Sequence, residues 1–558
     1  MTEAQQTARA WANAAWCDAG TRAEAARIAD ADADEAQRCF GHELAFGTGG
    51  LRGVLGVGTN RMNRYTVAKA TLGLARYLQK RGGKRVAISY DSRNGSYDFA
   101  LITAGVLAKQ GIEAYLYTRL LPTPMLSFAV RELCADAGVM ITASHNPAIY
   151  NGYKVYGADG CQITDEAAAA ITAEIERVRY DELVWDTESD ARANGMLVNT
   201  PESVYQRFLD KTMACRVAPS VDTPLTVCYT PLNGTGLEPV RDVLARMKRV
   251  TVIEVQEQLA PDGNFPTCPK PNPELKEALA LAIETAQKSN ASLVMATDPD
   301  CDRIGVAVRK PDGSFAILTG NEIGLLLLQF VLSSKHGGMP EGAEIVKTIV
   351  TSDLAFAIAK TYGVAVCETL TGFKYIGEEI GRLEKRGQEN RYMFGFEESC
   401  GYLAGTHVRD KDGVMAVLLV CELAQSAAAQ GKSLLDLLAA LYERYGHMRN
   451  RLLNFDLEGA DPMAVMRGMM ARLREQPPET LAGAPIETMK DYLPGVEGLP
   501  ASDVLSYANA RGKAIVRPSG TEPKVKVYLS ALAPSDAEAV AALDAMERDA
   551  RRWLLGTN

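Results

Sequence analysis

The stretch AGVMITASHNP, residues 137–147, runs from an apolar segment directly into a loop that carries Ser144 and His145. Two further stretches have the same form, SLVMATDPDCDR (292–303) and RYMFGFEES (391–399). From about residue 64, strand-like and helix-like segments alternate, which predicts parallel strands covered by helices. Ligands collect at the carboxyl ends of strands in such open sheets. The three loops are therefore predicted to contribute to one shared site.

The chain of 558 residues is too long for a single core. We predict an α/β fold with three similar domains of mixed or parallel sheet, 1–204, 205–318 and 319–448, and a C-terminal α+β domain, 449–558. The last contains a helix, a polar linker, the strand–loop–strand AIVRPSGTEPKVKVYLSA and a closing helix. Residues 3–40 predict two short helices with an acidic joint at 30–35, and LAFGTGGLRG (44–53) predicts a flexible turn.

Composition narrows the class of protein. A formal charge of -9 argues against an extended nucleic-acid surface. No run of eighteen apolar residues predicts a membrane span, and the N-terminus does not read as a secretory signal. Eleven scattered cysteines without CxxC pairs indicate reduced thiols. We expect a cytoplasmic enzyme without nucleic-acid or membrane partners; no sequence feature defines its oligomeric state.

The DPDCDR loop carries Asp298, Asp300 and Asp302 at alternate positions, where they can converge on one hard divalent cation. A calcium EF-hand requires Gly and Glu where this loop has Arg303 and Arg309, so that reading is excluded. A solvated acidic turn stays an alternative. Three carboxylates beside an arginine favour Mg²⁺ held next to a phosphate.

The RPSGTEPK loop combines Arg517, Ser519, Gly520 and Thr521, which suits a phosphate because arginine, hydroxyls and close backbone N–H groups all donate. An ordinary Pro-Ser-Gly turn is the alternative.

In GFEES, Glu397 and Ser399 suit sugar hydroxyls, although such pairs are common on surfaces. The cations Lys374, His407, Arg409 and Lys411 nearby hint at an anion.

Ser144 lacks the GxSxG frame of a hydrolase nucleophile. In extended geometry the side chain of His145 points away from that of Ser144. We therefore interpret Ser144 as a serine activated by the metal of DPDCDR for phosphoryl chemistry. The alternative is that Ser144 and Asn146 only close a turn.

Taken in order, TASHNP, DPDCDR, GFEES and RPSGT resemble the motifs of the α-D-phosphohexomutases. FGTGGLRG, NGYKVYG, TGFKYIG and the N-terminal helical extension resemble the phosphoglucomutase/phosphopentomutase branch, over essentially the whole chain. Two positions depart from the usual patterns: Gly49 stands where the branch often has Ala, and Phe396 replaces a Gly of the glucose-type GEES pattern.

The resemblance implies four domains around a central cleft and a phosphoryl group carried by Ser144. It implies one Mg²⁺ per active site, held by Asp298, Asp300, Asp302 and an oxygen of the phosphoserine. It places Arg303, as a substrate-binding residue, beside this metal. For the remaining residues it implies three roles: Arg52, His145 and Lys154 as candidates for proton transfer and charge neutralisation; sugar binding by Glu397 and Ser399, with Lys374 and Lys411 nearby; and a clamp on the non-reacting phosphate by Arg517, Ser519, Gly520 and Thr521.

The implied reaction is transfer of a phosphoryl group between C1 and C6 of glucose through a sugar bisphosphate, which also activates the enzyme. The partners are small sugar phosphates. A phosphopentomutase acting on ribose or deoxyribose 1-phosphate, or a sugar-1,6-bisphosphate synthase, is the alternative. A metal-dependent phosphatase needs no second phosphate clamp, and a non-catalytic sensor would tolerate loss of the serine.

Overall fold

The computed structural model describes residues 1–47, 49–457, 461–496, 498–519 and 524–556. It begins with three helices where the sequence predicted two: α1 (Glu3–Ala12), α2 (Ala19–Asp30) and α3 (Ala33–Phe40). The third helix begins within the acidic segment 30–35 that was predicted as a joint. The side chain of Asp32 accepts the backbone N–H of Glu35, so the acidic run caps a third helix instead of only linking two.

The first sheet has the strand order β1-β5-β4-β2-β3-β6. Strands β2, β3, β4 and β6 pair in parallel, whereas β5 is antiparallel to both β4 and β1. Its strands are β1 (Gly50–Val54), β2 (Arg85–Tyr90), β3 (Glu113–Leu116), β4 (Ala137–Ile141), β5 (Tyr150–Gly157) and β6 (Leu197–Asn199). Its helices are α4 (Arg64–Gln79), α5 (Ser96–Lys109), α6 (Thr123–Glu132), α7 (Asp165–Glu176) and α8 (Glu188–Ala193).

The glycine-rich segment 44–53 is not only a flexible turn, because its second half forms strand β1 against β5. At Gly50 the backbone φ is +137°, and a Cβ there would lie 1.8 Å from the carbonyl oxygen of Tyr153. Only glycine permits so close an approach of the two strands. The segment therefore adds an edge strand to the sheet beside β5 instead of forming a separate loop.

The second and third sheets repeat this plan, with order β11-β10-β9-β7-β8 in one and β13-β12-β14-β15 in the other. The second domain contains β7 (Leu225–Thr230), β8 (Val250–Glu254), β9 (Leu293–Thr297), β10 (Ile304–Arg309), β11 (Phe315–Leu318), α9 (Glu202–Met213), α10 (Leu237–Ala245) and α11 (Lys276–Ser289). The third contains β12 (Glu344–Thr348), β13 (Ala365–Thr369), β14 (Tyr392–Glu397), β15 (Gly401–Leu403), α12 (Gly320–Lys335), α13 (Leu354–Thr361), α14 (Phe373–Lys385), α15 (Gly413–Ala428) and α16 (Leu434–Tyr445).

One hydrophobic core joins these three domains. It includes Leu126 of α6, Met295 of β9, Leu327 of α12 and Leu418 of α15, all with little or no exposure. Helix α15 is predominantly apolar and buried along almost its whole length, which is typical of a helix enclosed by other elements. The shared core fixes the relative positions of the loops that the three sheets present.

The C-terminal domain is built differently, as an antiparallel sheet of order β16-β22-β21-β20-β19 with its own core. Strand β16 (His447–Asp456) precedes the helix that the sequence predicted at its start. The other elements are α17 (Pro462–Glu475), β17 (Thr480–Leu481), β18 (Ala484–Pro485), β19 (Thr488–Asp491), β20 (Leu505–Asn509), β21 (Gly512–Pro518), β22 (Lys524–Ala533) and α18 (Asp536–Leu555).

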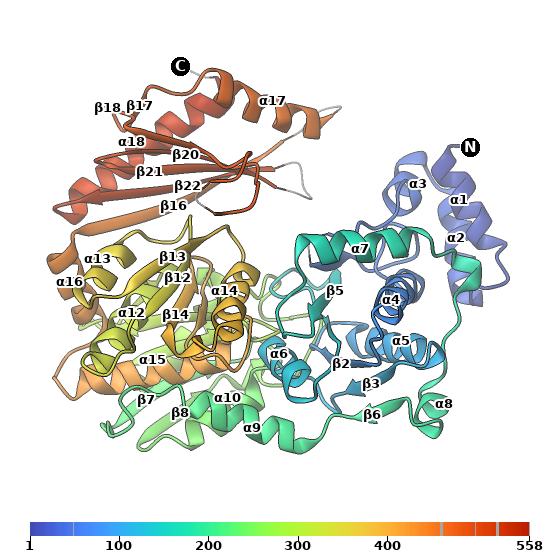
Figure 1. Cartoon of the computed structure of the whole chain (residues 1–558), viewed down its shortest axis with the longest axis horizontal. Helices are drawn as coiled ribbons and strands as arrows, with labels where there is room; N and C mark the ends of the chain where they lie inside the picture. The colour runs from blue at the N-terminus through green and yellow to red at the C-terminus, as the bar shows by residue number, and fades with distance from the viewer. Residues whose placement is uncertain (48, 458–460, 497, 520–523, 557–558) are drawn as a thin grey trace.

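Figure 1 shows the C-terminal domain stacked on the third domain and apart from the N-terminal helices. A small apolar cluster joins the third and C-terminal domains, with Ile349 and Leu370 from the third domain and Val504 and Ile515 from the C-terminal domain. Within the described residues, none of the helices has the length and apolar character needed to cross a bilayer.

Candidate active site

Three loops occupy the same topological position, each joining the last parallel strand of a sheet to its antiparallel neighbour. We call them the serine loop (142–149), the aspartate loop (298–303) and the glutamate loop (398–400). Each contains a non-glycine residue with positive φ: Ser144 (+51°), Cys301 (+50°) and Cys400 (+61°). Non-glycine residues in this conformation are uncommon and often mark functional turns.

Ser144 lies against the aspartate loop, as the sequence predicted. Its hydroxyl donates to Oδ2 of Asp298 at 2.7 Å, and its side chain is buried. Its backbone N–H donates to Oγ1 of Thr142 at 2.8 Å. The positive φ of Ser144 turns the side chain out of the strand direction and toward the carboxylates.

One expectation about His145 is wrong. Its Nδ1 lies 3.2 Å from the Ser144 hydroxyl, because the left-handed conformation of Ser144 brings the two adjacent side chains together. Burial lowers the pKa of His145 well below its ordinary value, and the nearby Arg303 cation lowers it further. His145 is therefore neutral near pH 7 and can exchange a hydrogen bond with the serine.

The three aspartates form the compact carboxylate cluster that the sequence predicted. One oxygen from each of Asp298, Asp300 and Asp302 lies within 4.8 Å of the others, and all three residues are buried. Oδ1 of Asp300 and Oδ1 of Asp302 have no hydrogen-bond partner. Buried oxygens without partners are costly, so this donor set fits a hard divalent cation that would complete their coordination.

Cations from two other domains surround this cluster. Lys154 of β5 lies 2.8 Å from Oδ2 of Asp300, and Lys411 lies 3.3 Å from Oδ2 of Asp302. Burial alone would lower the pKa of Lys154, but the two carboxylates outweigh it and raise that pKa. For Asp300, burial would raise the pKa, but Lys154 outweighs it and lowers that pKa.

Asp298 is different, because its nearest charges are other carboxylates. Burial, followed by Asp300 and Asp302, raises the pKa of Asp298 well above its usual range. This residue also accepts the Ser144 hydroxyl. Arg303, which follows the cluster, donates instead to Oε1 of Glu274 at 2.8 Å and to the carbonyl oxygen of Ser399 at 3.1 Å.

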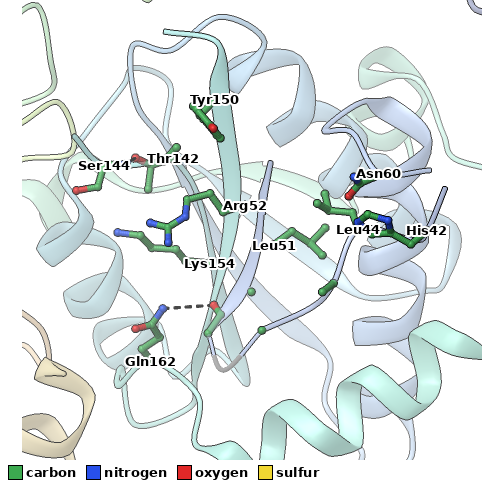
Figure 2. Close-up of a pocket in the computed structure, with 15 residues that line it drawn as sticks. His42, Leu44, Leu51, Arg52, Asn60, Thr142, Ser144, Tyr150, Lys154 and Gln162 are labelled. Atoms are coloured by element: carbon green, nitrogen blue, oxygen red, sulfur yellow. Dashed lines mark hydrogen bonds between the residues drawn. The ribbon is translucent and has the colours of Figure 1, made fainter. Parts of the chain in front are cut away.

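Arg52 reaches the same region from β1. Gly50 pairs with Lys154, so Arg52, two residues farther along β1, faces the same side of the sheet as Lys154. Figure 2 shows both side chains extending toward the side on which Ser144 lies. They line a cavity of about 410 Å³ that also includes Thr142 and Ser144. Arg52 is exposed, so it is available to a ligand.

Gly49, one of the two departures from the related patterns, lies on the rim of this cavity. A Cβ at Gly49 would lie 2.3 Å from Nε2 of Gln162, whose amide donates to the carbonyl oxygen of Gly49 at 3.3 Å. Figure 2 shows this bond. Glycine here therefore leaves room for the Gln162 side chain.

The glutamate loop and its flanks only partly follow the prediction. Glu397 is buried, with Oε1 3.9 Å from Nζ of Lys411, so it faces the same cluster. Lys374 does not join it: its Nζ lies 2.7 Å from Oδ1 of Asp165 in the first domain. Phe396, the residue before Glu397 in β14, packs against Gly324 of α12, where the missing side chain of the glycine makes room for its ring.

Of the cations in HVRDKDG, only Lys411 reaches the carboxylate cluster. Arg409 is buried against Glu384, and His407 contacts Asp412.

The predicted phosphate clamp lies on the C-terminal domain. Arg517 interacts with the hydroxyl of Tyr528 on the adjacent strand, and the pKa of Tyr528 is raised to about 12 by burial and by the nearby Glu398. Ser519 follows β21, whereas Gly520 and Thr521 lie outside the described residues.

Sequence reasoning missed the residue that holds the serine loop. Arg93, in the loop after β2, is buried and donates to the carbonyl oxygens of Pro147 at 3.0 Å and Tyr150 at 3.1 Å, and also to those of Ser144 and Asn146. Its partner is the buried Asp91, which accepts the hydroxyls of Thr142 and Ser96 at 2.6 and 2.7 Å. In the sequence, the only mark of this pair is that the apolar stretch RVAISY (85–90) ends in the polar residues DSRNG (91–95).

A second missed residue, Thr123, holds the aspartate loop. Its hydroxyl donates to Oδ2 of Asp300 at 2.9 Å, and its backbone N–H donates to the carbonyl oxygen of Asp300 at the same distance. Thr123 is the first residue of α6, far from Asp300 in sequence, and no local pattern marks it.

Comparison with known proteins returns four family models, in chain order. They are described as Phosphoglucomutase/phosphomannomutase alpha/beta/alpha domain I (residues 43–182), domain II (204–313), domain III (319–445) and C-terminal domain (462–550). The matches confirm the predicted fold class and the family resemblance. The domain boundaries and the roles of the site residues stay predictions.

A phosphoglucomutase of Staphylococcus aureus is 36% identical over 524 residues, which cover 92% of this chain and 94% of that protein. Among solved structures, a putative phosphomannomutase from Thermus thermophilus superposes with a TM-score of 0.69 at 24% identity, covering 91% and 99% of the two chains. The open form of pp63/parafusin from Paramecium superposes with a TM-score of 0.70 at 17% identity, covering 92% and 96%. These two structures share the fold of this chain.

Proposed function

We propose that this protein interconverts glucose 1-phosphate and glucose 6-phosphate. The proposal starts from its family: the chain belongs to the phosphoglucomutase/phosphomannomutase family and is a phosphosugar mutase. The observation that carries the proposal is the 2.7 Å contact between the Ser144 hydroxyl and Asp298 within the carboxylate cluster. A serine in this position can carry a phosphoryl group whose oxygens face a divalent cation.

The metal in this proposal is one Mg²⁺ per active site, held by Asp298, Asp300 and Asp302 and by an oxygen of phosphorylated Ser144. When bound, it neutralises charge on the phosphoryl oxygens. The protein supplies three hard carboxylate donors, two of which have buried oxygens without partners. Lys154 and Lys411, already beside these carboxylates, would turn toward the phosphoryl oxygens and the sugar as charge accumulates there.

The proposed cycle transfers the phosphoryl group twice. Ser144 gives its phosphoryl group to a hydroxyl of the sugar monophosphate, which becomes a sugar bisphosphate, and the hydroxyl proton leaves to a base. The bisphosphate then reorients, and Ser144 takes the other phosphoryl group as a proton returns to the departing sugar oxygen. His145, which is neutral, and Lys154, whose raised pKa keeps it protonated, are the candidates for these proton transfers. Arg52 is a candidate to neutralise charge. Added sugar bisphosphate would activate the enzyme by phosphorylating Ser144.

Binding of both ends of the sugar requires a second phosphate site. Glu397 and Ser399 would hold hydroxyls, with Arg303 and Lys411 beside them, and Lys374 would need to leave Asp165 to take part. Arg517, Ser519, Gly520 and Thr521 would bind the phosphate that does not react. A phosphatase has no use for such a second clamp. The free cysteines support a reducing compartment, so we propose the cytosol.

The choice of glucose is tested by comparing kcat/KM for glucose 1-phosphate and ribose 1-phosphate in the wild type and in Glu397→Ala. A site that hydrogen-bonds a particular hydroxyl penalises substrates that lack it, so the wild type should prefer the hexose. Glu397→Ala should lower this preference by at least about tenfold. Glu284→Ala, on the exposed face of α11, is the control that should leave the ratio unchanged. A wild type that prefers ribose, with both substrates equally impaired in the variant, would assign a phosphopentomutase instead.

A further inference from the structure

A cysteine, a histidine and an aspartate meet outside the site described above. Cys215 follows α9, and His407 and Asp412 lie in the segment between β15 and α15. Sγ of Cys215 lies 4.0 Å from Nδ1 of His407, and Nε2 of His407 lies 3.2 Å from Oδ2 of Asp412. The thiol also donates to the carbonyl oxygen of Ala404 at 3.0 Å, which holds it beside the imidazole.

The hydrogen bonds define the tautomer of His407. Asp412 accepts the backbone N–H of Met415 at 3.0 Å through its other oxygen, so both carboxylate oxygens serve as acceptors. Nε2 of His407 must then carry the proton that is shared with Asp412. In the neutral ring this leaves the lone pair of Nδ1 facing the thiol, which is the arrangement in which an imidazole can take up a thiol proton.

The thiol lies on the wall of a cavity of about 440 Å³ that opens to solvent between the first three domains. Glycine at 405 leaves the space beside it: a Cβ there would lie 2.9 Å from Sγ of Cys215 and 3.3 Å from Nδ1 of His407. The charged residues that line the cavity are Arg131, Glu132, Lys211, Glu384 and Glu389. The cavity is therefore large and polar enough to admit a small charged thiol or disulfide.

The other cysteines lack this environment. Eight of the eleven are buried. Cys367 is half-buried, and burial raises its pKa to about 12. Cys134 is exposed, but among the described residues Cys215 is the one cysteine with an imidazole within hydrogen-bond reach. Burial would lower the pKa of His407, but Cys215 and Asp412 outweigh it and raise that pKa to about 9. A raised pKa makes the imidazole of His407 a stronger acceptor for the thiol proton.

We propose that Cys215 is a site of reversible thiol–disulfide exchange with a small disulfide, with His407 as its base and Asp412 as the positioning residue. In this exchange, Nδ1 of His407 takes the thiol proton and the Cys215 sulfur attacks one sulfur of the disulfide. The S–S bond of the reagent breaks and a mixed disulfide forms. The departing thiolate takes the proton from His407, so Cys215 is oxidised and half of the reagent leaves as a thiol.

The test treats the full-length protein with oxidised glutathione near pH 7 and follows each cysteine by peptide mass spectrometry. Cys134 is the internal control, because its greater exposure would make it the faster thiol if access alone decided the rate. We expect Cys215 to form the mixed disulfide at least about tenfold faster than Cys134. A thiol reductant should remove the adduct, and Cys215→Ser should lack it.

His407→Gln keeps a polar side chain of similar length but removes the base. In this variant the rate at Cys215 should fall at least about tenfold while the rate at Cys134 stays constant. The proposal is overturned if Cys215 reacts no faster than Cys134 in the wild type, or if the ratio of their rates is unchanged in His407→Gln. If thermal unfolding shows that His407→Gln is not folded, the ratio of the Cys215 and Cys134 rates in the wild type alone decides.

Discussion

The serine loop and the aspartate loop occupy equivalent positions in two sheets, yet they are held in opposite ways. The serine loop is held through its backbone, because Arg93 binds the carbonyl oxygens of four of its residues or neighbours. The aspartate loop is held mainly through its side chains. Oδ1 of Asp298 accepts the backbone N–H groups of Asp302 and Arg303, and lysines from other domains reach its carboxylates.

The difference follows from the charge that each loop carries. A serine has no charge through which neighbours can hold it, so its position depends on a buried cation that binds the surrounding carbonyl groups. The aspartates repel one another, and they need cations in contact with them to stay ionised when buried. Damage to the serine loop should therefore act through geometry, whereas damage to the aspartate loop should act through charge balance.

The largest effect is expected at Ser144 itself. Ser144→Ala removes the group proposed to carry the phosphoryl, so mutase turnover should fall at least about a thousandfold. The fold should survive, since the hydroxyl makes one hydrogen bond to Asp298 and one contact with His145. Coupled assay of glucose 6-phosphate formation and thermal unfolding measure the two outcomes. An active Ala variant would mean that the serine loop is only a turn.

The aspartate loop should respond to charge. Chelation of the metal should abolish turnover, and Mg²⁺ should restore it. Asp298→Asn can still accept both backbone N–H groups, so the metal-free protein should melt no lower than the wild type, while turnover falls at least about a hundredfold.

Mg²⁺ should raise the melting temperature of the wild type and should fail to raise that of Asp298→Asn. Asp312→Asn, in an exposed turn, is the matched control. Full turnover in excess chelator would contradict the metal assignment.

Substitutions of Arg93 test how the backbone of the serine loop is held. Arg93→Lys keeps a cation beside Asp91 but loses the planar fork that serves several carbonyl groups, so kcat should fall about ten- to a hundredfold with KM little changed. Arg93→Met leaves Asp91 buried and uncompensated, which should cost about 3–5 kcal/mol of unfolding free energy.

Arg241→Lys, in a half-exposed pair with Glu254, is the control and should change stability by no more than about 1 kcal/mol. If Arg93→Lys turned over at the wild-type rate, the hydrogen bonds from Arg93 to the backbone of the serine loop would have no part in positioning Ser144.

The smallest effect is expected at Thr142, whose hydroxyl links Asp91, the partner of Arg93, to the backbone N–H of Ser144. Thr142→Val leaves the Ser144 N–H without its acceptor and removes one donor to Asp91, at a cost of about 1–3 kcal/mol of stability. The fall in kcat should not exceed about tenfold, because Arg93 still holds the loop. Thr142→Ser keeps the hydroxyl and should restore both quantities. Equal losses in the Val and Ser variants would show that packing of the methyl group is what matters.

The order of the motifs along the chain was sufficient to predict much of this protein. Alternating strands and helices predicted the α/β class, and the residue types of TASHNP and DPDCDR predicted a serine beside a carboxylate cluster. These predictions succeed because they depend on local chemistry: a buried strand followed at once by polar residues must present them at its end. The third helix and strand β16 were missed, because capping and edge pairing overrode the local pattern.

Only the tertiary structure decided which of the candidate residues meet and what holds them. Lys374 pairs with Asp165 across a domain interface, and Arg93 reaches the serine loop from another strand end. His145 turns toward Ser144 through a single positive φ. The first two contacts join residues 209 and 54 positions apart, and the third depends on one backbone angle. They are set by the shared core that fixes the sheets against one another, and no local sequence pattern encodes that packing.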